Sequence, residues 1–200
     1  ANSGNVAFYR TGTLTYGGVI SGSGTVSKGS TGTVIWTGNN TYTGATTISG
    51  GTLQIGNGGT TGWLASTSIT NDGTLSFNRS DDKTYSGNIE GDGSVVQAGS
   101  GTLILSGTNT YKGGTTISAG KLQVASDAKL GDATGTVTLD GGTLSLAGTI
   151  TSARSYGITN RNGTIDTGTN TDTISGVISD KVANEAGALT KTGTGTLVLT

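Results

Sequence analysis

The chain has 200 residues, a formal net charge of −1 at pH 7, and no Pro, Cys, Met or His. The absence of Cys and His excludes disulfides, structural zinc sites and Ser-His or Cys-His catalytic pairs, so we expect no cofactor and no metal. Its 11 basic residues against 12 acidic ones provide no basic face for nucleic acid.

The first part of the chain, about residues 2–70, contains short segments in which apolar residues alternate with polar ones. The segment Gly51-Thr52-Leu53-Gln54-Ile55 shows the pattern Gly-Thr-apolar-x-apolar. A period of two is typical of a strand with one buried face. The strands are about 4–6 residues long and end at Gly, Asn, Asp or Ser, which favour turns.

A second copy covers about residues 71–139, displaced by 69 positions. Residues 32–55 fall on residues 101–124 without a gap, and 15 of 24 positions are identical. Repetition at a fixed period is typical of solenoid proteins. The spacing of about 20–23 residues between strands is too long for hairpins and contains no helical pattern.

The third copy, about residues 140–200, contains two insertions. We expect one extra coil at about residues 147–173 and a loop at about 180–187. A solenoid tolerates an added coil because each unit contacts only its neighbours. The chain ends within a repeat, so we expect a fragment of a longer protein, in which residues 1–200 form a single solenoid.

These observations predict an all-β fold, a right-handed parallel β-helix of roughly nine coils with a super-repeat of about 69 residues. If the super-repeat is about three coils, equivalent residues of successive copies stack in one row of the core. The predicted rows are Leu53 with Leu122, Ile55 with Val124, Ile48 with Ile117, Ile20 with Ile89 and Ile178, Val34 with Leu103 and Leu197, and Trp36 with Leu105 and Leu199.

The segment from Gly101 to Leu122, GTLILSGTNTYKGGTTISAGKL, resembles the passenger repeat of bacterial autotransporters, the type V secretion family, and so does the segment from Gly32 to Leu53. The resemblance implies a structural or adhesive stalk, extracellular or at the surface of a Gram-negative bacterium. It also implies a parent chain anchored by a C-terminal membrane barrel that lies outside this sequence.

Candidate contacts with a partner are few and lie mostly at the insertions. Trp63 has no aromatic counterpart in the second copy, where Asp132 holds the equivalent position, so it is either an exposed contact or a loop anchor. The complete set is Trp63, Arg154, Arg161, Asp166, Asp172, Lys181 and Glu185. We expect a host glycan or protein as partner, or self-association through the end coils or the Thr, Ser and Asn faces.

Three other functions are disfavoured. Asp166 and Asp172 near the two arginines could form the carboxylate pair of a polysaccharide-processing β-helix, but a solvated edge that protects the insertion from edge pairing is the favoured interpretation. The acidic clusters at residues 81–82 and 90–92 lack calcium-repeat spacing and are interpreted as polar turns. The Thr arrays at 167–173 and 192–196 shift position between coils, which disfavours ice binding.

Overall fold

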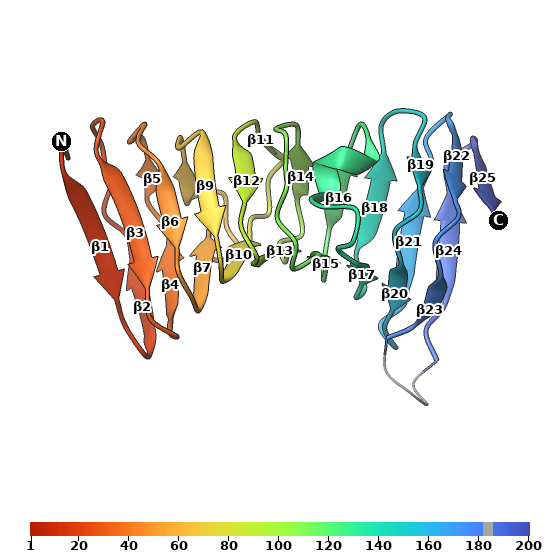
Figure 1. Ribbon diagram of the computed structural model, residues 1–200, viewed down its shortest axis with the longest axis horizontal. Helices are drawn as coiled ribbons and strands as arrows, with labels where there is room; N and C mark the ends of the chain where they lie inside the picture. Colours follow the sequence, from red (N-terminus) through yellow and green to blue (C-terminus); the bar gives the residue numbers. More distant parts are fainter. Residues whose placement is uncertain (182–185) are drawn as a thin grey trace.

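The computed structural model describes residues 1–181 and 186–200. They form an elongated stack of coils with the two ends of the chain at opposite ends of the stack (Figure 1). Each strand pairs in parallel with a strand about one coil away, as Thr33 does with Thr13 and Thr52. The predicted all-β parallel solenoid is therefore confirmed, while its right-handed sense stays a prediction.

The largest sheet receives one strand from each coil, so its number of strands equals the number of coils. It has nine strands in the order of the stack, which confirms the predicted number of roughly nine coils. These strands are β2 (Thr13–Tyr16), β4 (Thr33–Trp36), β7 (Thr52–Ile55), β10 (Thr74–Phe77), β13 (Ser94–Gln97), β15 (Thr115–Ile117), β17 (Val137–Leu139), β20 (Tyr156–Ile158) and β23 (Ile178–Asp180).

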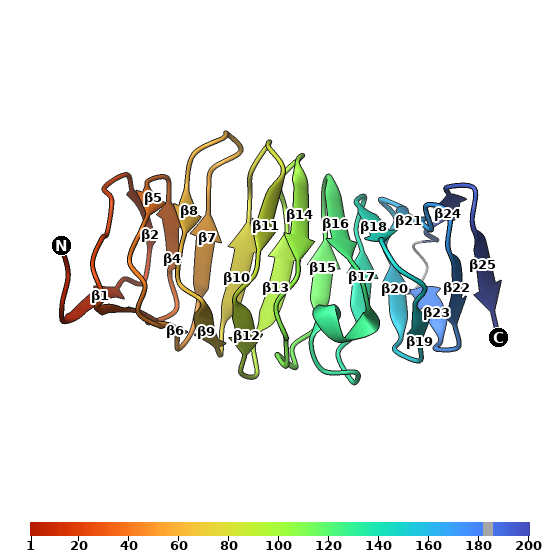
Figure 2. The same cartoon turned by 90° about the horizontal axis from the view of Figure 1, so that it is seen from above.

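Four smaller sheets form the other faces (Figure 2). The five-stranded sheet precedes the nine-stranded sheet in each early coil and contains β1 (Asn5–Tyr9), β3 (Thr25–Gly29), β6 (Thr46–Ile48), β9 (Ser68–Asn71) and β12 (Asn88–Glu90). In the last coils the three-stranded sheet takes its place in the chain order, with β19 (Thr151–Ser152), β22 (Thr171–Ile174) and β25 (Thr196–Leu199).

The third face follows the nine-stranded sheet along the chain. It begins with the two-stranded sheet, β5 (Asn39–Asn40) and β8 (Trp63–Leu64). It continues with the six-stranded sheet, β11 (Lys83–Tyr85), β14 (Thr102–Leu105), β16 (Lys121–Val124), β18 (Thr143–Leu146), β21 (Gly163–Asp166) and β24 (Leu189–Thr192). A single 3-10 turn, η1 (Asp127–Leu130), is the one helical element among the described residues.

The core runs through the coils because strands alternate inward apolar and outward polar residues. Val34 and Trp36 of β4 are buried, and the intervening Ile35 is partly exposed. Burial of each aliphatic side chain contributes roughly 1.5–3 kcal/mol. Gly51 turns the chain into the next strand with a φ of 63°, and a Cβ there would collide with the Gly32 carbonyl.

The predicted rows of the core are wrong. Leu53 lies in the nine-stranded sheet between Val34 and Leu75. Leu122 lies in the six-stranded sheet between Leu103 and Leu144. The other predicted rows likewise join residues of different sheets: Ile55 with Val124, Ile48 with Ile117, Val34 with Leu103 and Leu197, Trp36 with Leu105 and Leu199, and Ile89 of β12 with Ile178 of β23, while Ile20 lies outside the named strands.

The cause is that the displacement between the copies is not a whole number of coils. It carries β1 and β3 of the five-stranded sheet onto β10 and β13 of the nine-stranded sheet, and β4 and β7 of the latter onto β14 and β16 of the six-stranded sheet. β10 lies three coils after β2 in the nine-stranded sheet. Because β1 precedes β2 in the chain, the displacement that carries β1 onto β10 is longer than three coils. Each such displacement therefore corresponds to three coils and one further face.

Candidate functional site

A loop leaves the stack between β7 and β8. The preceding coil passes from β4 to β5 through two residues, whereas residues 56–62 form the same connection one coil later. Gly56, Gly58 and Gly62 all have positive φ values, which glycine adopts without steric cost. The sequence GNGGTTG thus allows the extra residues to fold outward at Trp63, the first residue after the loop.

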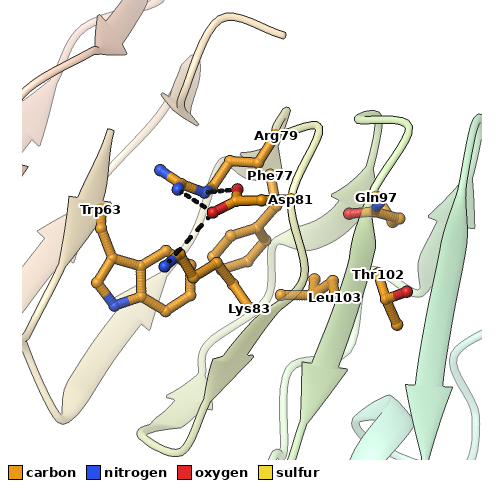
Figure 3. Close-up of a pocket in the computed structure, with 8 residues that line it drawn as sticks. All are labelled: Trp63, Phe77, Arg79, Asp81, Lys83, Gln97, Thr102 and Leu103. Carbon is orange, nitrogen blue, oxygen red and sulfur yellow. Dashed lines mark hydrogen bonds and ion pairs between the residues drawn. The ribbon is translucent and has the colours of Figure 1, made fainter. Parts of the chain in front are cut away.

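Arg79 of the following coil fixes this loop. Its guanidinium donates to the carbonyls of Thr60 and Gly62. It also forms two hydrogen bonds of 2.8 Å to the carboxylate of Asp81 (Figure 3). Lys83 adds a weaker contact, with its Nζ 3.4 Å from Oδ2 of Asp81. Bidentate pairs of this kind are geometrically specific as well as strong. Arg79 is buried, and its N–H groups bond to the loop and to Asp81 within the protein.

Trp63 packs against Arg79 and two aromatic rings. Its ring lies 6.1 Å from that of Phe77, and the Arg79 Cζ lies 5.8 Å from the Trp63 centroid (Figure 3). The ring of Tyr85 lies 6.3 Å from that of Trp63. The cavity beside the indole has a volume of about 10 Å³, close to the space that one water molecule needs. Of the two interpretations of Trp63, the packing favours the loop anchor.

Arg154 fixes a second, larger loop in the same manner. Residues 125–136 leave the stack between β16 and β17 and include η1. The Arg154 guanidinium makes two hydrogen bonds of 2.8 Å to Asp127. It also donates to the loop carbonyls of Asp127, Leu130, Gly131, Asp132 and Gly135. Its exposed fraction is only 2%, so Arg154 is not available as the predicted partner contact.

The ion pair that Arg154 forms keeps Asp127 charged. Partial burial by itself raises the pKa of Asp127, but hydrogen bonds from Arg154 and Ser152 outweigh it, so the pKa lies below its usual value. In the first loop, the hydrogen bond from Arg79 is the main cause of the lowered pKa of Asp81. Both pairs are therefore ionised at neutral pH, and both hold loops. Sequence analysis missed Arg79, although the Arg-x-Asp spacing of residues 79–81 was a usable signal.

The predicted charged region around the insertion is not a single cluster. Arg161 is exposed and bonds Asp140 at 2.9 Å and the Ser118 carbonyl at 3.0 Å. Asp166 of β21 pairs with Lys121 at 3.1 Å. Asp172 of β22 is fully buried. The charged residues expected to lie together thus make separate sets of contacts.

Lys181 lies at a broad groove on the outer side of the nine-stranded sheet. Gly157 leaves room for its side chain, since a Cβ there would lie 3.1 Å from the Lys181 Cδ. The groove has a volume of about 410 Å³, and its lining is mostly hydroxyl groups: Ser94, Thr115, Thr116, Thr134, Thr136 and Thr138, together with Lys112 and Lys181. Hydroxyl groups both donate and accept hydrogen bonds, so this lining can bond a polar partner. Glu185 lies outside the described residues.

Within residues 1–181 and 186–200, no group of three or more Asp and Glu side chains is placed to hold a metal ion. In the same part of the chain, no helix has the length and apolarity needed to cross a membrane.

Comparison with known proteins shows similarity over parts of the chain. Residues 26–55, 95–124 and 189–200 match the model of the passenger-associated-transport-repeat. A stretch of 46 residues is 52% identical to the adhesin BmaC autotransporter of Brucella suis biovar 1 (strain 1330) and covers 23% of this chain but 1% of that protein. No solved structure matches. The first two repeat matches begin at Val26 of β3 and Val95 of β13, which belong to different sheets.

Proposed function

We propose that this chain, which carries passenger-associated transport repeats, is a stalk segment of an autotransporter passenger, displayed at the surface of a Gram-negative bacterium or released from it. In this proposal the segment has no catalytic role and keeps other parts of the passenger away from the membrane. The observation that carries it is the unbroken nine-stranded sheet, which joins every coil to the next by parallel pairing.

The energetics support a mechanical role. Each coil is bonded to its neighbours and contributes side chains to one core, so stability accumulates along the stack. The two loops depart from this regularity, and each is fixed by a buried arginine of the following coil, Arg79 or Arg154. The rod thus accommodates loops while its coils stay paired, as a rigid spacer requires.

A second candidate function is a binding module, favoured by the hydroxyl-lined groove beside Lys181. Its polar lining suits a host glycan or a polar protein surface, in line with the adhesin similarity. Among the candidate contacts predicted from the sequence, Arg161 and Lys181 are exposed, and these two are the proposed contacts. Self-association through the end coils or the Thr, Ser and Asn faces stays a prediction.

A coil deletion and a groove variant, both made in the parent protein on the bacterial surface, together test the two candidates. Deleting residues 33–51 joins Gly32 to Thr52 and removes one coil outside the groove, because Thr33 pairs directly with Thr52. A stalk keeps its adhesion to host cells in this deletion and in a Thr116→Asn, Thr138→Asn, Lys181→Ala groove variant. A binding module keeps adhesion in the coil deletion and loses it in the groove variant. Loss in both, with normal surface display, contradicts the spacer role.

A further inference from the structure

Three polar side chains perform the same task in three different coils. Asn40, Asn109 and Asp172 each accept a hydrogen bond from the backbone N–H of an isoleucine in the preceding coil. The partners are Ile20 at 2.9 Å, Ile89 at 3.0 Å and Ile150 at 2.8 Å. All three side chains are buried. They therefore link successive coils from within the core.

The two asparagines also link forward, to the following coil. The Asn40 Nδ2 donates to the Trp63 carbonyl at 3.2 Å, and the Asn109 Nδ2 donates to the Lys129 carbonyl at 2.8 Å. In Asp172 the corresponding atom is Oδ2, which is buried and has no hydrogen-bond partner among the described residues. A carboxylate has no proton to donate, whereas a neutral carboxylic acid has one.

The surroundings of Asp172 favour the neutral form. The nearby titratable groups are Lys191 on β24 and Tyr156 on β20; β19 supplies Ser152, and β25 supplies no titratable side chain. Lys191 donates to the carbonyls of Gly193 and Gly195 rather than to Asp172. An unpaired buried carboxylate is costly, and such groups commonly take up a proton instead.

We propose that Asp172 is a proton-dependent latch: as a neutral acid it donates from Oδ2 to a backbone carbonyl of β25, and on ionisation it loses this link and weakens the docking of that strand. Asp172 pairs with Leu197 as Asn40 pairs with Leu64. Since Asn40 donates to the residue before its partner, the same register assigns the Thr196 carbonyl as the acceptor.

The direction of the pH effect follows from the protonation equilibrium. Burial raises the pKa of Asp172, and the Ile150 N–H and Lys191 offset this only in part. The folded chain then binds one more proton than the unfolded chain between the ordinary aspartate pKa and the raised one. The contribution of Asp172 to stability is complete below about pH 4 and is lost as the pH rises through the raised pKa.

Reciprocal variants test the latch. Asp172→Asn supplies a permanent donor, and Asn109→Asp places a carboxylate at the equivalent position of another coil. We expect the Tm of the wild type to fall by a few degrees between pH 4 and pH 8 relative to Asp172→Asn, and Asn109→Asp to show a steeper fall than the wild type. If Asp172→Asn is less stable than the wild type at pH 8, or if its pH profile is unchanged, the proposal is wrong.

A spectroscopic measurement avoids dependence on stability. Infrared difference spectra between the wild type and Asp172→Asn report the carboxylic-acid carbonyl stretch of Asp172 directly. We expect this band to persist above the ordinary aspartate pKa and to disappear as the pH rises further, together with faster amide exchange in β25 after correction for the intrinsic rate. Loss of the band at the ordinary aspartate pKa would show that Asp172 ionises like an exposed carboxyl and would overturn the latch.

Discussion

Leu53 and Leu122 hold equivalent positions in the repeat and lie in different sheets of the solenoid. Leu53 pairs with Val34 and Leu75 in the nine-stranded sheet, and Leu122 pairs with Leu103 and Leu144 in the six-stranded sheet. The structural unit is therefore the single coil, and the sequence repeat spans three coils and one face. A deletion that removes one whole coil should therefore keep the strands in their sheets.

Deletion of residues 33–51 should leave a folded rod with one coil fewer. Thr52 then takes the place of Thr33 beside Thr13, and apolar residues remain inward. Deletion of residues 33–42 removes half a coil and places strands on the wrong faces. We expect cooperative thermal unfolding and a β-type circular dichroism spectrum for the first deletion only. Equal stability of both would contradict coil-based stacking.

Loss of the buried arginine pair should cost far more than loss of the exposed one. Removing one partner of a buried ion pair costs about 3–5 kcal/mol, and exposed pairs contribute about 0–1 kcal/mol. Arg154→Met breaks the pair with Asp127, whereas Arg161→Met breaks the exposed pair with Asp140. Urea unfolding measures both, and a cost below about 1 kcal/mol for Arg154→Met would rule out its role in fixing the loop.

Lys28 should be replaceable by glutamine. It is buried, and its Nζ donates to the carbonyls of Ser30 at 2.8 Å and Gly50 at 2.7 Å. Gln97, its counterpart one repeat on, donates in a similar way to Gly99 and Gly101. We expect a change within about 1 kcal/mol for Lys28→Gln and a loss of about 1–3 kcal/mol for Lys28→Met, which leaves both carbonyls unpaired. Equal losses in denaturant titrations would contradict this.

Alkaline unfolding should begin near pH 10. Burial raises the pKa of Tyr42 and of Tyr111 from 10.0 to about 12. The folded chain then holds protons that the unfolded chain has released, so stability is complete below pH 10 and falls as the pH rises toward 12. Tyr42→Phe and Tyr111→Phe should each flatten the fall. Absorbance of the tyrosinate and far-ultraviolet dichroism, followed together, should change in one step.

The architecture was predictable from sequence because it depends on local patterns. Alternation in segments such as Thr52–Ile55 indicates a strand, and the distance between such segments fixes the coil. The core rows were not predictable in the same way. Sequence identity between the copies is consistent with a displacement of three whole coils and equally with three coils plus one face. Only the pairing of particular strands distinguishes these two displacements.

The candidate contacts were less predictable, because composition does not reveal which charges become buried. Arg154 lies in an insertion and so suggested a surface role, but the carbonyls of residues 127–135 enclose it once the loop folds back. Asp172 enters the core because it occupies a position that Asn40 and Asn109 fill in other coils. Neither relation is visible until the coils are stacked.

The advance of one face per sequence repeat determines how surface chemistry is distributed on the rod. An outward side chain that recurs in each copy faces a new direction every time, so its copies trace a spiral around the axis. A ligand that recognises the repeat at several points must wrap around the rod, whereas a straight polymer lying along it meets unrelated positions. Recurrent motifs in this chain therefore give the rod similar chemistry on all sides. Local differences such as the loops distinguish one side of the rod from another.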